Sequence, residues 1–346
     1  MAIYHLSVKI CGRGRGIGGS DQSPIASAAY QSGEKLYNEK DGEIKNYGRK
    51  ERIVAQGLML AKNFPQDWDR ERLWNEVERA EKNKNAQLYR KWEMALPTEL
   101  SDEQNIEFAK KFVKKYFVRK GMCADWAIHG GKNPHLHVMT TVRGMDQNHQ
   151  WQPKKRKEYI LDFDGQKQYD KKTKTYKCTT KSTNDWHTKD FLHKIRKAWA
   201  DEQNTALKQA GYKSRVSEKS YKDLAKNNQL YHYLRPTKHR GQSLKYDNQT
   251  EMAHNEKIIR TYIRDGLRHY HKHGNIKIMK KITHDCANIA GFNSKRIQNI
   301  VDVEKENLKN ALKKIGTDAL KPEINWELLS EYERADLTYK QSGYDL

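Results

Sequence analysis

The sequence predicts an α+β fold, in which an antiparallel or mixed sheet is covered by helices. Short stretches that alternate apolar and polar residues indicate half-buried strands, while longer stretches with apolar residues three or four positions apart indicate amphipathic helices. The two kinds of element do not alternate strictly, as they would around a parallel sheet. From about residue 245 onward the chain is polar, basic and helix-prone, which predicts a helical C-terminal extension.

The first elements predicted are a strand, a loop and a helix. Residues 2–10 (AIYHLSVKI) alternate, which is typical of a half-buried strand with His5 on its polar face. Residues 12–19 (GRGRGIGG) form a loop rich in glycine and arginine. Ser23 and Pro24 then suit the N-cap and the first position of a helix, which we expect to run to about residue 36.

The middle of the chain continues with further strands and helices. We expect strands at 52–60, 91–97, 124–129 and 135–144, and helices at 66–82, 101–119 and 185–211. Residues 151–183 are rich in lysine and poor in large apolar side chains, which predicts an extended hairpin or a mobile arm. The expected organisation is a first domain over 1–215, a connecting extension over 216–245 and a basic helical region over 246–346.

Composition indicates a polyanionic partner and a reducing compartment. Lys and Arg outnumber Asp and Glu by 66 to 44, a formal net charge of +22, and nucleic acid is the partner that best suits such an excess. The four cysteines are far apart and form no CxxC pair, which suits free thiols in the cytoplasm. The N-terminus does not resemble a signal peptide, and no stretch is apolar enough to cross a bilayer. We therefore expect a cytoplasmic protein with no membrane partner.

Three of the 14 histidines are concentrated in the stretch HGGKNPHLHVM. His135 and His137 are two positions apart on an expected strand and therefore share a face. His129 ends the preceding strand, so a hairpin would bring all three imidazoles together. Three imidazoles with open coordination positions are typical of a catalytic metal site, although polar surface histidines are the alternative. The segment HYHKH at 269–273 has an i, i+2, i+4 spacing that does not converge on a helix.

A candidate nucleophile lies in IASAAYQSGEKLY, residues 25–37. Tyr30 and Tyr37 are seven residues apart, which would place them on one face of the expected helix. Neighbouring polar residues such as Gln31 make this stretch less typical of a core helix. A tyrosine hydroxyl has a pKa near 10 and needs activation, for which Glu93 could serve as the base or as a partner of the histidines.

The loop GRGIGG at 14–19 matches the dinucleotide-binding pattern G-x-G-x-x-G. That fold would need a parallel second strand ending in an acidic residue, and YNEKDGEIKNYGRKE is not such a strand. We interpret Arg13 and Arg15 instead as contacts for phosphate or DNA, together with Arg143 beyond the histidines.

Several longer stretches resemble the MobA/MobL family of plasmid mobilisation relaxases, within the histidine-hydrophobic-histidine endonuclease superfamily. They are MAIYHL, SAAYQSGEKLY, LWNEVERAEKNKNAQ, EMALP, AIH followed by NPHLHVM, TVRGMD, KAWADEQNTALKQAG and RPTKHRG. The resemblance implies a five-stranded antiparallel sheet with a metal on its face, held by His129, His135 and His137. Family members often carry glutamate where this chain has Lys91, two positions before Glu93.

The same resemblance implies an activity and partners. Tyr30 would attack the scissile phosphate of single-stranded oriT DNA beside a hairpin, leaving a 5′-phosphotyrosyl link that is rejoined after conjugative transfer. Mn²⁺ or Mg²⁺ would be the metal, and a type IV secretion coupling protein and accessory relaxosome proteins the partners. Tyr37 would be a possible substitute nucleophile, and His5 either a neighbour of the site or an ordinary sheet histidine.

Two other functions stay open. A rolling-circle replication initiator uses the same chemistry, but its tyrosine generally follows the histidine motif, whereas Tyr30 precedes it. A non-catalytic plasmid DNA-binding protein with vestigial histidines is the other alternative.

Overall fold

The structure is a computed structural model that divides into two compact units, residues 2–210 and residues 211–346 together with Met1. It describes residues 4–14, 22–47, 52–131, 133–212, 214–228, 230–236, 249–274, 276–287, 289, 292 and 294–320. No helix within these ranges is both long enough and apolar enough to cross a bilayer. The predicted contact residue Arg15 lies outside the described residues.

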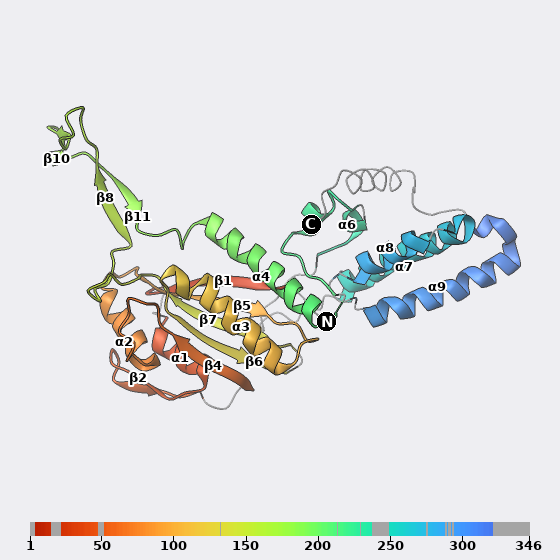
Figure 1. The fold of residues 1–346 in the computed structure, drawn as a ribbon, viewed down its shortest axis with the longest axis horizontal. Coiled ribbons are helices and arrows are strands. Elements are labelled where there is room, and N and C mark those ends of the chain that lie inside the picture. Colours follow the sequence, from red (N-terminus) through yellow and green to blue (C-terminus); the bar gives the residue numbers. More distant parts are fainter. Residues whose placement is uncertain are drawn as a thin grey trace. The chain divides into compact units, whose positions relative to one another are not determined.

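A five-stranded antiparallel sheet forms the centre of the first unit (Figure 1). Its strand order is β1-β5-β7-β6-β4, and every neighbouring pair is antiparallel. The strands are β1 (Leu6–Gly12), β4 (Ile53–Met59), β5 (Gln87–Ala95), β6 (Ala124–His129) and β7 (His135–Thr141). This confirms the predicted α+β class and differs from the parallel sheet that a dinucleotide-binding fold requires.

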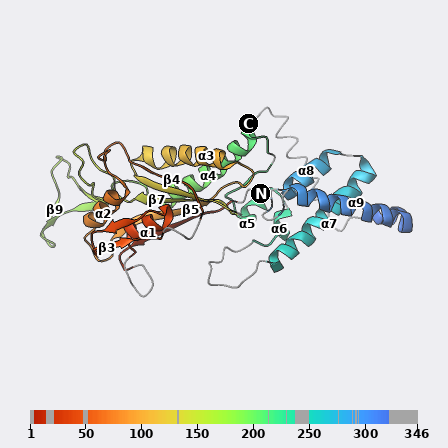
Figure 2. The same cartoon turned by 90° about the horizontal axis from the view of Figure 1, so that it is seen from below.

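Helices cover both faces of this sheet (Figure 2). On one face, α3 (Asp102–Tyr116) and α4 (Lys189–Gln209) bury Phe112 and Trp199 against strand residues such as Trp92. On the other face, α1 (Pro24–Ser32) and α2 (Arg70–Ala80) pack their apolar side chains beside Tyr89 and Met139. A short 3-10 turn, η2 (Val118–Lys120), follows α3. Both apolar cores therefore depend on the same central strands.

The first helix begins as predicted but ends earlier. The Ser23 hydroxyl accepts a hydrogen bond from the Ala26 backbone N–H, which confirms the N-cap. Gly33 has a φ of 72° and its N–H donates to the Ala29 carbonyl, a left-handed cap that glycine adopts at little cost. The helix therefore stops at Ser32 rather than near residue 36.

The early end of α1 corrects the placement of Tyr37. This residue lies in β2 (Leu36–Asn38), which pairs with β3 (Glu43–Lys45), so Tyr30 and Tyr37 do not share a helix face. Tyr37 is 43% exposed, and its backbone N–H donates to the Glu71 carboxylate of α2. The prediction that Tyr30 and Tyr37 lie on one face of a helix is therefore wrong.

Residues 155–182 form the predicted hairpin (Figure 1). Strands β8 (Lys155–Tyr159) and β11 (Cys178–Ser182) pair in an antiparallel register, and β9 (Tyr169–Asp170) pairs with β10 (Thr175–Tyr176) beyond them. The side chains of Tyr159, Tyr169 and Tyr176 are 41–50% exposed, and the Lys167 ammonium lies 4.1 Å from the Tyr159 ring centre. The hairpin thus presents aromatic and basic side chains on its surface.

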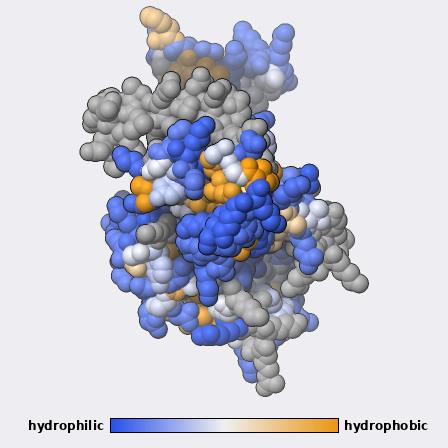
Figure 3. All heavy atoms as spheres, turned by 90° about the vertical axis from the view of Figure 1, so that its right-hand side faces the viewer, coloured by the Kyte–Doolittle hydropathy of each residue, from blue (hydrophilic) through white to orange (hydrophobic). Residues whose placement is uncertain are grey.

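The second unit is helical in its described part. It contains α5 (Tyr221–Leu224), α6 (Leu230–Tyr233), α7 (Gln249–His273), α8 (Ile276–Ala287), α9 (Ser294–Ile315) and η3 (Gly316–Leu320). Its apolar core includes Ile259, Ile263 and Leu308, and the buried Glu304 accepts a hydrogen bond from Arg264 at 2.9 Å. Hydrophilic residues dominate the face of the molecule drawn in Figure 3. The helical character expected after residue 245 is confirmed for these residues.

Candidate active site

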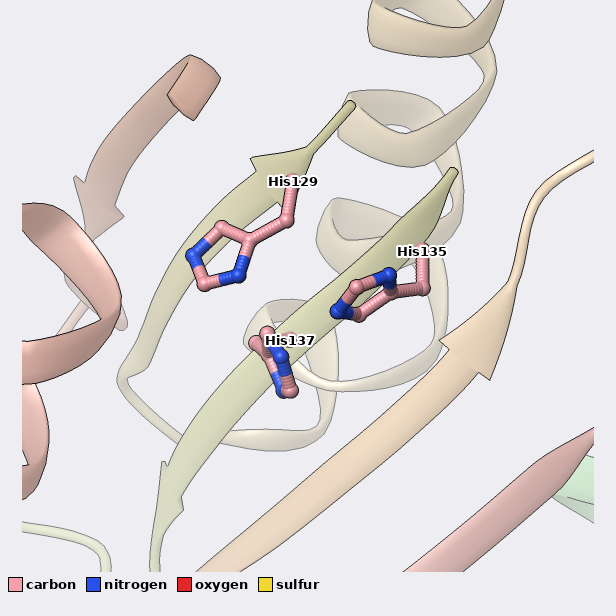
Figure 4. Close-up of side chains that lie close together, drawn as sticks. All are labelled: His129, His135 and His137. Carbon is pink, nitrogen blue, oxygen red and sulfur yellow. The ribbon is translucent and has the colours of Figure 1, made fainter. Parts of the chain in front are cut away.

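Three imidazoles converge where β6 and β7 meet (Figure 4). His129 ends β6 and is the direct cross-strand partner of His135, while His137 follows two residues later on the same face of β7. One nitrogen from each ring lies within 4.8 Å of the others. Among the described residues, this is the one cluster of at least three His, Cys, Asp or Glu side chains with such spacing. The predicted convergence of the histidines is confirmed.

Two of the rings have backbone partners that define their tautomers. Nε2 of His129 lies 2.9 Å from the carbonyl oxygen of Gln31, and Nδ1 of His135 lies 2.9 Å from that of Asn133. Because a carbonyl oxygen can only accept, each of these nitrogens carries a proton and donates it. The lone pairs therefore belong to Nδ1 of His129 and Nε2 of His135, the nitrogens that face the centre of the cluster in Figure 4.

The third ring is kept neutral. Burial, together with the positive charge of Lys91 and the repulsion that protonated His135 and His129 would exert, lowers the pKa of His137 to about 2. Its Nδ1 is buried and has no hydrogen-bond partner among the described residues. A buried imidazole nitrogen of this kind is suited to a metal ion, which coordinates neutral imidazole.

The spacing of the three rings is compatible with one ion. Metal–nitrogen bonds of about 2.1 Å hold ligand nitrogens at most about 4.2 Å apart, so small side-chain rotations would close the cluster. Three neutral nitrogen donors leave coordination positions for other ligands. The residues present therefore fit a divalent metal.

The same face of the sheet carries two further charged side chains close to the histidines. Glu93 of β5 is the direct cross-strand partner of His137, and Lys91 is that of Met139, the next position on this face of β7. Direct cross-strand neighbours have Cβ atoms about 5 Å apart. Glu93 is therefore adjacent to the histidine cluster, which agrees with its predicted place in the site.

Tyr30 lies on the α1 helix above this face. The Lys91 ammonium is 5.6 Å from its ring centre, and the Tyr47 ring meets it edge-on with centres 5.9 Å apart. Tyr30 is 36% exposed, so the ring is held on two sides while part of the side chain reaches solvent. Gln31, the next residue, is the one that accepts the hydrogen bond from His129. The tyrosine and the histidine cluster are thus joined through adjacent backbone atoms.

A buried ion pair fixes α2 beside the histidines. Asp125 of β6 is fully buried and accepts hydrogen bonds from Arg70 Nε at 3.0 Å and from Trp74 Nε1 at 2.8 Å. Arg70 also pairs with Glu34 at 2.5 Å. Burial raises the pKa of Asp125, and the positive charge of Arg70 opposes that shift. The network joins a strand of the histidine face to α2 and to Glu34, two residues beyond the end of α1.

Two of the predicted DNA-contacting arginines, Arg13 and Arg143, lie beside the C-terminal end of α2. Arg13 donates to the backbone carbonyls of Glu78 and Glu81, each at 3.1 Å. Arg143 pairs with the Glu81 carboxylate at 2.6 Å and donates to the Gln152 carbonyl. Both guanidinium groups therefore have intramolecular partners, and their contact with DNA stays a prediction.

His5 lies at the outer edge of the same face. Its carbonyl oxygen accepts a hydrogen bond from the Ala95 N–H, and Ala95 is in turn the cross-strand partner of His135. His5 thus stands two strands away from His135 and is a neighbour of the site rather than a member of the cluster.

Sequence patterns alone did not identify Gln31, Asp125 or Arg70 as part of the site. One signal was available, because Asp125 is an acidic residue within the short apolar strand ADWAIH, and a buried acid requires a partner. Arg70 had no comparable signal, since arginine is ordinary on a helix surface.

Comparison with known proteins places these features in a family. The family model described as "MobA/MobL family" matches residues 22–249. "Conjugal transfer protein TraA" of Agrobacterium fabrum (strain C58) is 34% identical over 235 residues, covering 64% of this chain and 20% of that protein. "Probable mobilization protein MobA" of Bifidobacterium longum is 31% identical over 259 residues, covering 70% of this chain and 43% of that protein. The chain thus spans less than half the length of these two relatives.

A solved structure is similar as well. The chain described as "Molecular Basis of Vancomycin Resistance Transfer in Staphylococcus aureus" is 31% identical, with a TM-score of 0.53. The similarity covers 64% of this chain and all of the solved chain. Apart from β1, the strands of the sheet and the helices around the histidine cluster lie within the part of the sequence that the family model matches.

Proposed function

The chain belongs to the MobA/MobL family, and we propose that it is a plasmid mobilisation relaxase, a nickase and strand transferase for single-stranded oriT DNA. In this proposal Tyr30 is the nucleophile and His129, His135 and His137 hold a divalent metal. The observation that carries the proposal is the hydrogen bond from His129 to Gln31, the residue next to Tyr30. It brings a tyrosine and a trihistidine cluster together from distant parts of the chain.

The proposed reaction is a transesterification. The Tyr30 oxygen attacks the scissile phosphorus, a tyrosine O–P bond forms, and the bond from phosphorus to the 3′-oxygen breaks. The tyrosine proton leaves to a base and the 3′-oxygen takes up a proton, which gives a 5′-phosphotyrosyl link and a 3′-hydroxyl. The link retains the phosphodiester, so the reverse reaction rejoins the strand after conjugative transfer without another energy source.

The residues of the site divide the chemical tasks. A divalent ion held by three imidazoles supplies positive charge that polarises a phosphate oxygen, and Mn²⁺ or Mg²⁺ suits that task. Glu93, beside His137, serves as the base or as a hydrogen-bond partner of the histidine cluster. Lys91 lies against the Tyr30 ring, where its charge favours both the phenolate and the incoming phosphate. The Tyr47 ring limits the positions that the Tyr30 ring can adopt.

DNA binding is proposed for the 155–182 hairpin and for the arginines beside the end of α2. The 155–182 hairpin offers exposed tyrosines for stacking and lysines for phosphate contacts with single-stranded DNA and an adjacent hairpin duplex. Arg13 and Arg143 would contribute if DNA displaces their present partners. A type IV secretion coupling protein and accessory relaxosome proteins are the proposed protein partners. We propose a cytoplasmic location for these events.

A covalent-adduct assay tests the proposal. The protein is incubated with Mn²⁺ and the transfer-origin strand of its own plasmid, and a denaturing gel is examined for a DNA-linked band. We expect an adduct in the wild type that is lost with EDTA and in the Tyr30→Phe variant. Tyr37→Phe is the matched control, because it removes the hydroxyl of a tyrosine of similar exposure outside α1.

The outcomes separate the alternatives. An adduct that survives Tyr30→Phe but not Tyr37→Phe would transfer the nucleophilic role to Tyr37. Tight binding of the strand without any adduct would favour a non-catalytic DNA-binding protein. Efficient joining of a cleaved strand to a second origin strand is expected of a strand transferase.

A further inference from the structure

Gln31 makes two hydrogen bonds to the strand that ends in the first metal ligand. Its side-chain Nε2 donates to the carbonyl oxygen of Asp125 at 3.1 Å, and its own carbonyl oxygen accepts from Nε2 of His129 at 2.9 Å. Asp125 and His129 lie at positions i and i+4 of one strand, so their side chains share one face of β6. Gln31 is fully buried, which is unusual for glutamine and requires such partners.

We propose that Gln31 is a positioning residue that orients the metal ligand His129 and holds the Tyr30 end of α1 against β6. The inference rests on the proposed function, since it assigns to Gln31 the coupling between nucleophile and metal site. Gln31 touches neither the DNA nor the metal in this scheme. It acts through His129 on one side and through its neighbour Tyr30 on the other.

The position of Gln31 at the end of a helix gives its carbonyl a specific effect on His129. The last four carbonyls of a helix have no partner within the helix, and the C-terminal end carries partial negative charge. Gln31 is the penultimate residue of α1, so its carbonyl is one of these acceptors. A ligating histidine whose other ring nitrogen donates to such an acceptor has a defined tautomer and a more basic lone pair.

The side-chain bond holds that carbonyl in place. The helix end could otherwise rotate, since Gly33 follows immediately and ends the helix with a positive φ. The Asp125 carbonyl anchors Gln31, while the Asp125 carboxylate is itself fixed by Arg70 and Trp74 of α2. A movement of α1 would therefore change the geometry at His129 and at Tyr30 together.

The test replaces the amide of Gln31 with an apolar side chain of similar length, Gln31→Met. Gln203→Met is the matched control, because Gln203 is also fully buried and its Nε2 also donates to a strand carbonyl, that of Ala95, at 2.9 Å. Gln203 lies on α4, on the face of the sheet opposite the histidines. Both variants lose the same kind of hydrogen bond.

Mn²⁺ binding to the full chain is measured by calorimetry, and adduct formation by the gel assay. We expect Gln31→Met to weaken Mn²⁺ binding about tenfold and to slow adduct formation, and Gln203→Met to change both less than about twofold. Equal effects of the two variants, or unchanged Mn²⁺ affinity in folded Gln31→Met, would overturn the inference. A wild type that binds Mn²⁺ but forms no adduct would count against the proposed function alone, because the Mn²⁺ titrations still compare the two variants.

A second measurement needs no folded variant. Imidazole ¹⁵N spectra of the metal-free wild type report which nitrogen of each histidine carries the proton. The inference requires the Nε2–H tautomer for His129, with Nδ1 changing on addition of Zn²⁺. The opposite tautomer would exclude the hydrogen bond to Gln31 and refute the proposed role.

Discussion

Substitution of Asp125 tests whether the buried ion pair holds the helices over the histidine face. The carboxylate is fully buried and its partner Arg70 is 6% exposed, so Asp125→Asn leaves a guanidinium with little access to water. Removal of one partner of a buried pair costs about 3–5 kcal/mol. Arg70 retains Glu34 at 2.5 Å, which reduces the loss toward about 3 kcal/mol.

A double-mutant cycle measures the interaction itself. Arg70→Met alone leaves the Asp125 carboxylate buried with only the Trp74 donor and the Gln31 contact nearby, and we expect it to cost about as much as Asp125→Asn. The double variant leaves no uncompensated charge at this position. Its cost should be at least about 2 kcal/mol smaller than the sum of the two single costs.

Tryptophan fluorescence during urea unfolding is the suitable assay. Seven of the eight tryptophans lie within residues 2–210, so the signal reports mainly on the unit that contains the ion pair. Single-variant costs that add within about 0.5 kcal/mol would refute the reasoning, because they would mean that Asp125 and Arg70 do not interact in the folded protein. A loss of less than about 1 kcal/mol in the free energy of unfolding for Asp125→Asn would also refute the reasoning.

Two further predictions concern the titration and the charge of the site. His137 has a folded-state pKa of about 2, below the unfolded value near 6.5, so acid favours the unfolded chain and stability in EDTA falls as pH drops through 6.5. At pH 5.5 the loss in the free energy of unfolding amounts to about 1.4 kcal/mol. Between pH 7.5 and 5.5 the free energy of unfolding should therefore fall less in His137→Gln than in the wild type, by that amount. Equal falls in the two proteins would contradict the burial of a neutral ring. Lys91→Met should slow adduct formation about tenfold, because the charge beside Tyr30 is lost. The control is Lys9→Met, which removes the charge of the cross-strand neighbour of Lys91 and should have little effect on the rate. Similar rates for the two variants would count against a role of Lys91.

Local patterns were sufficient for most strands and helices of the central sheet and for the histidine cluster. The alternation in ADWAIH and HLHVMTT reflects the two-residue period of a strand, and a short hairpin must bring its two ends together. The convergence of His129, His135 and His137 therefore depends on residues close in sequence. The early end of α1 was also encoded locally, in Gly33, but the seven-residue spacing of Tyr30 and Tyr37 suggested a longer helix.

The placement of Tyr30 beside this cluster depends on packing between distant segments. Gln31 and His129 are 98 residues apart, and Gln31 and Asp125 are 94 apart, so no local period relates them. The strand order sets β6 next to β4 and leaves its histidine face for α1 and α2 to cover. The family resemblance pointed to Tyr30 as the nucleophile, but the contacts that hold Tyr30 in place arise from this packing.

For the charged residues, the sequence determines the net charge and the tertiary structure determines the ion pairs. Amino-acid composition is enough to establish a basic chain, because net charge is a sum that does not depend on folding. Which charges face outward depends on their partners in space: Arg70 is buried against Asp125, and Arg143 pairs with Glu81 across 62 residues of sequence. A guanidinium finds such a partner only when helix and strand come together, because the cost of burying a charge is offset by a contact that the unfolded chain lacks.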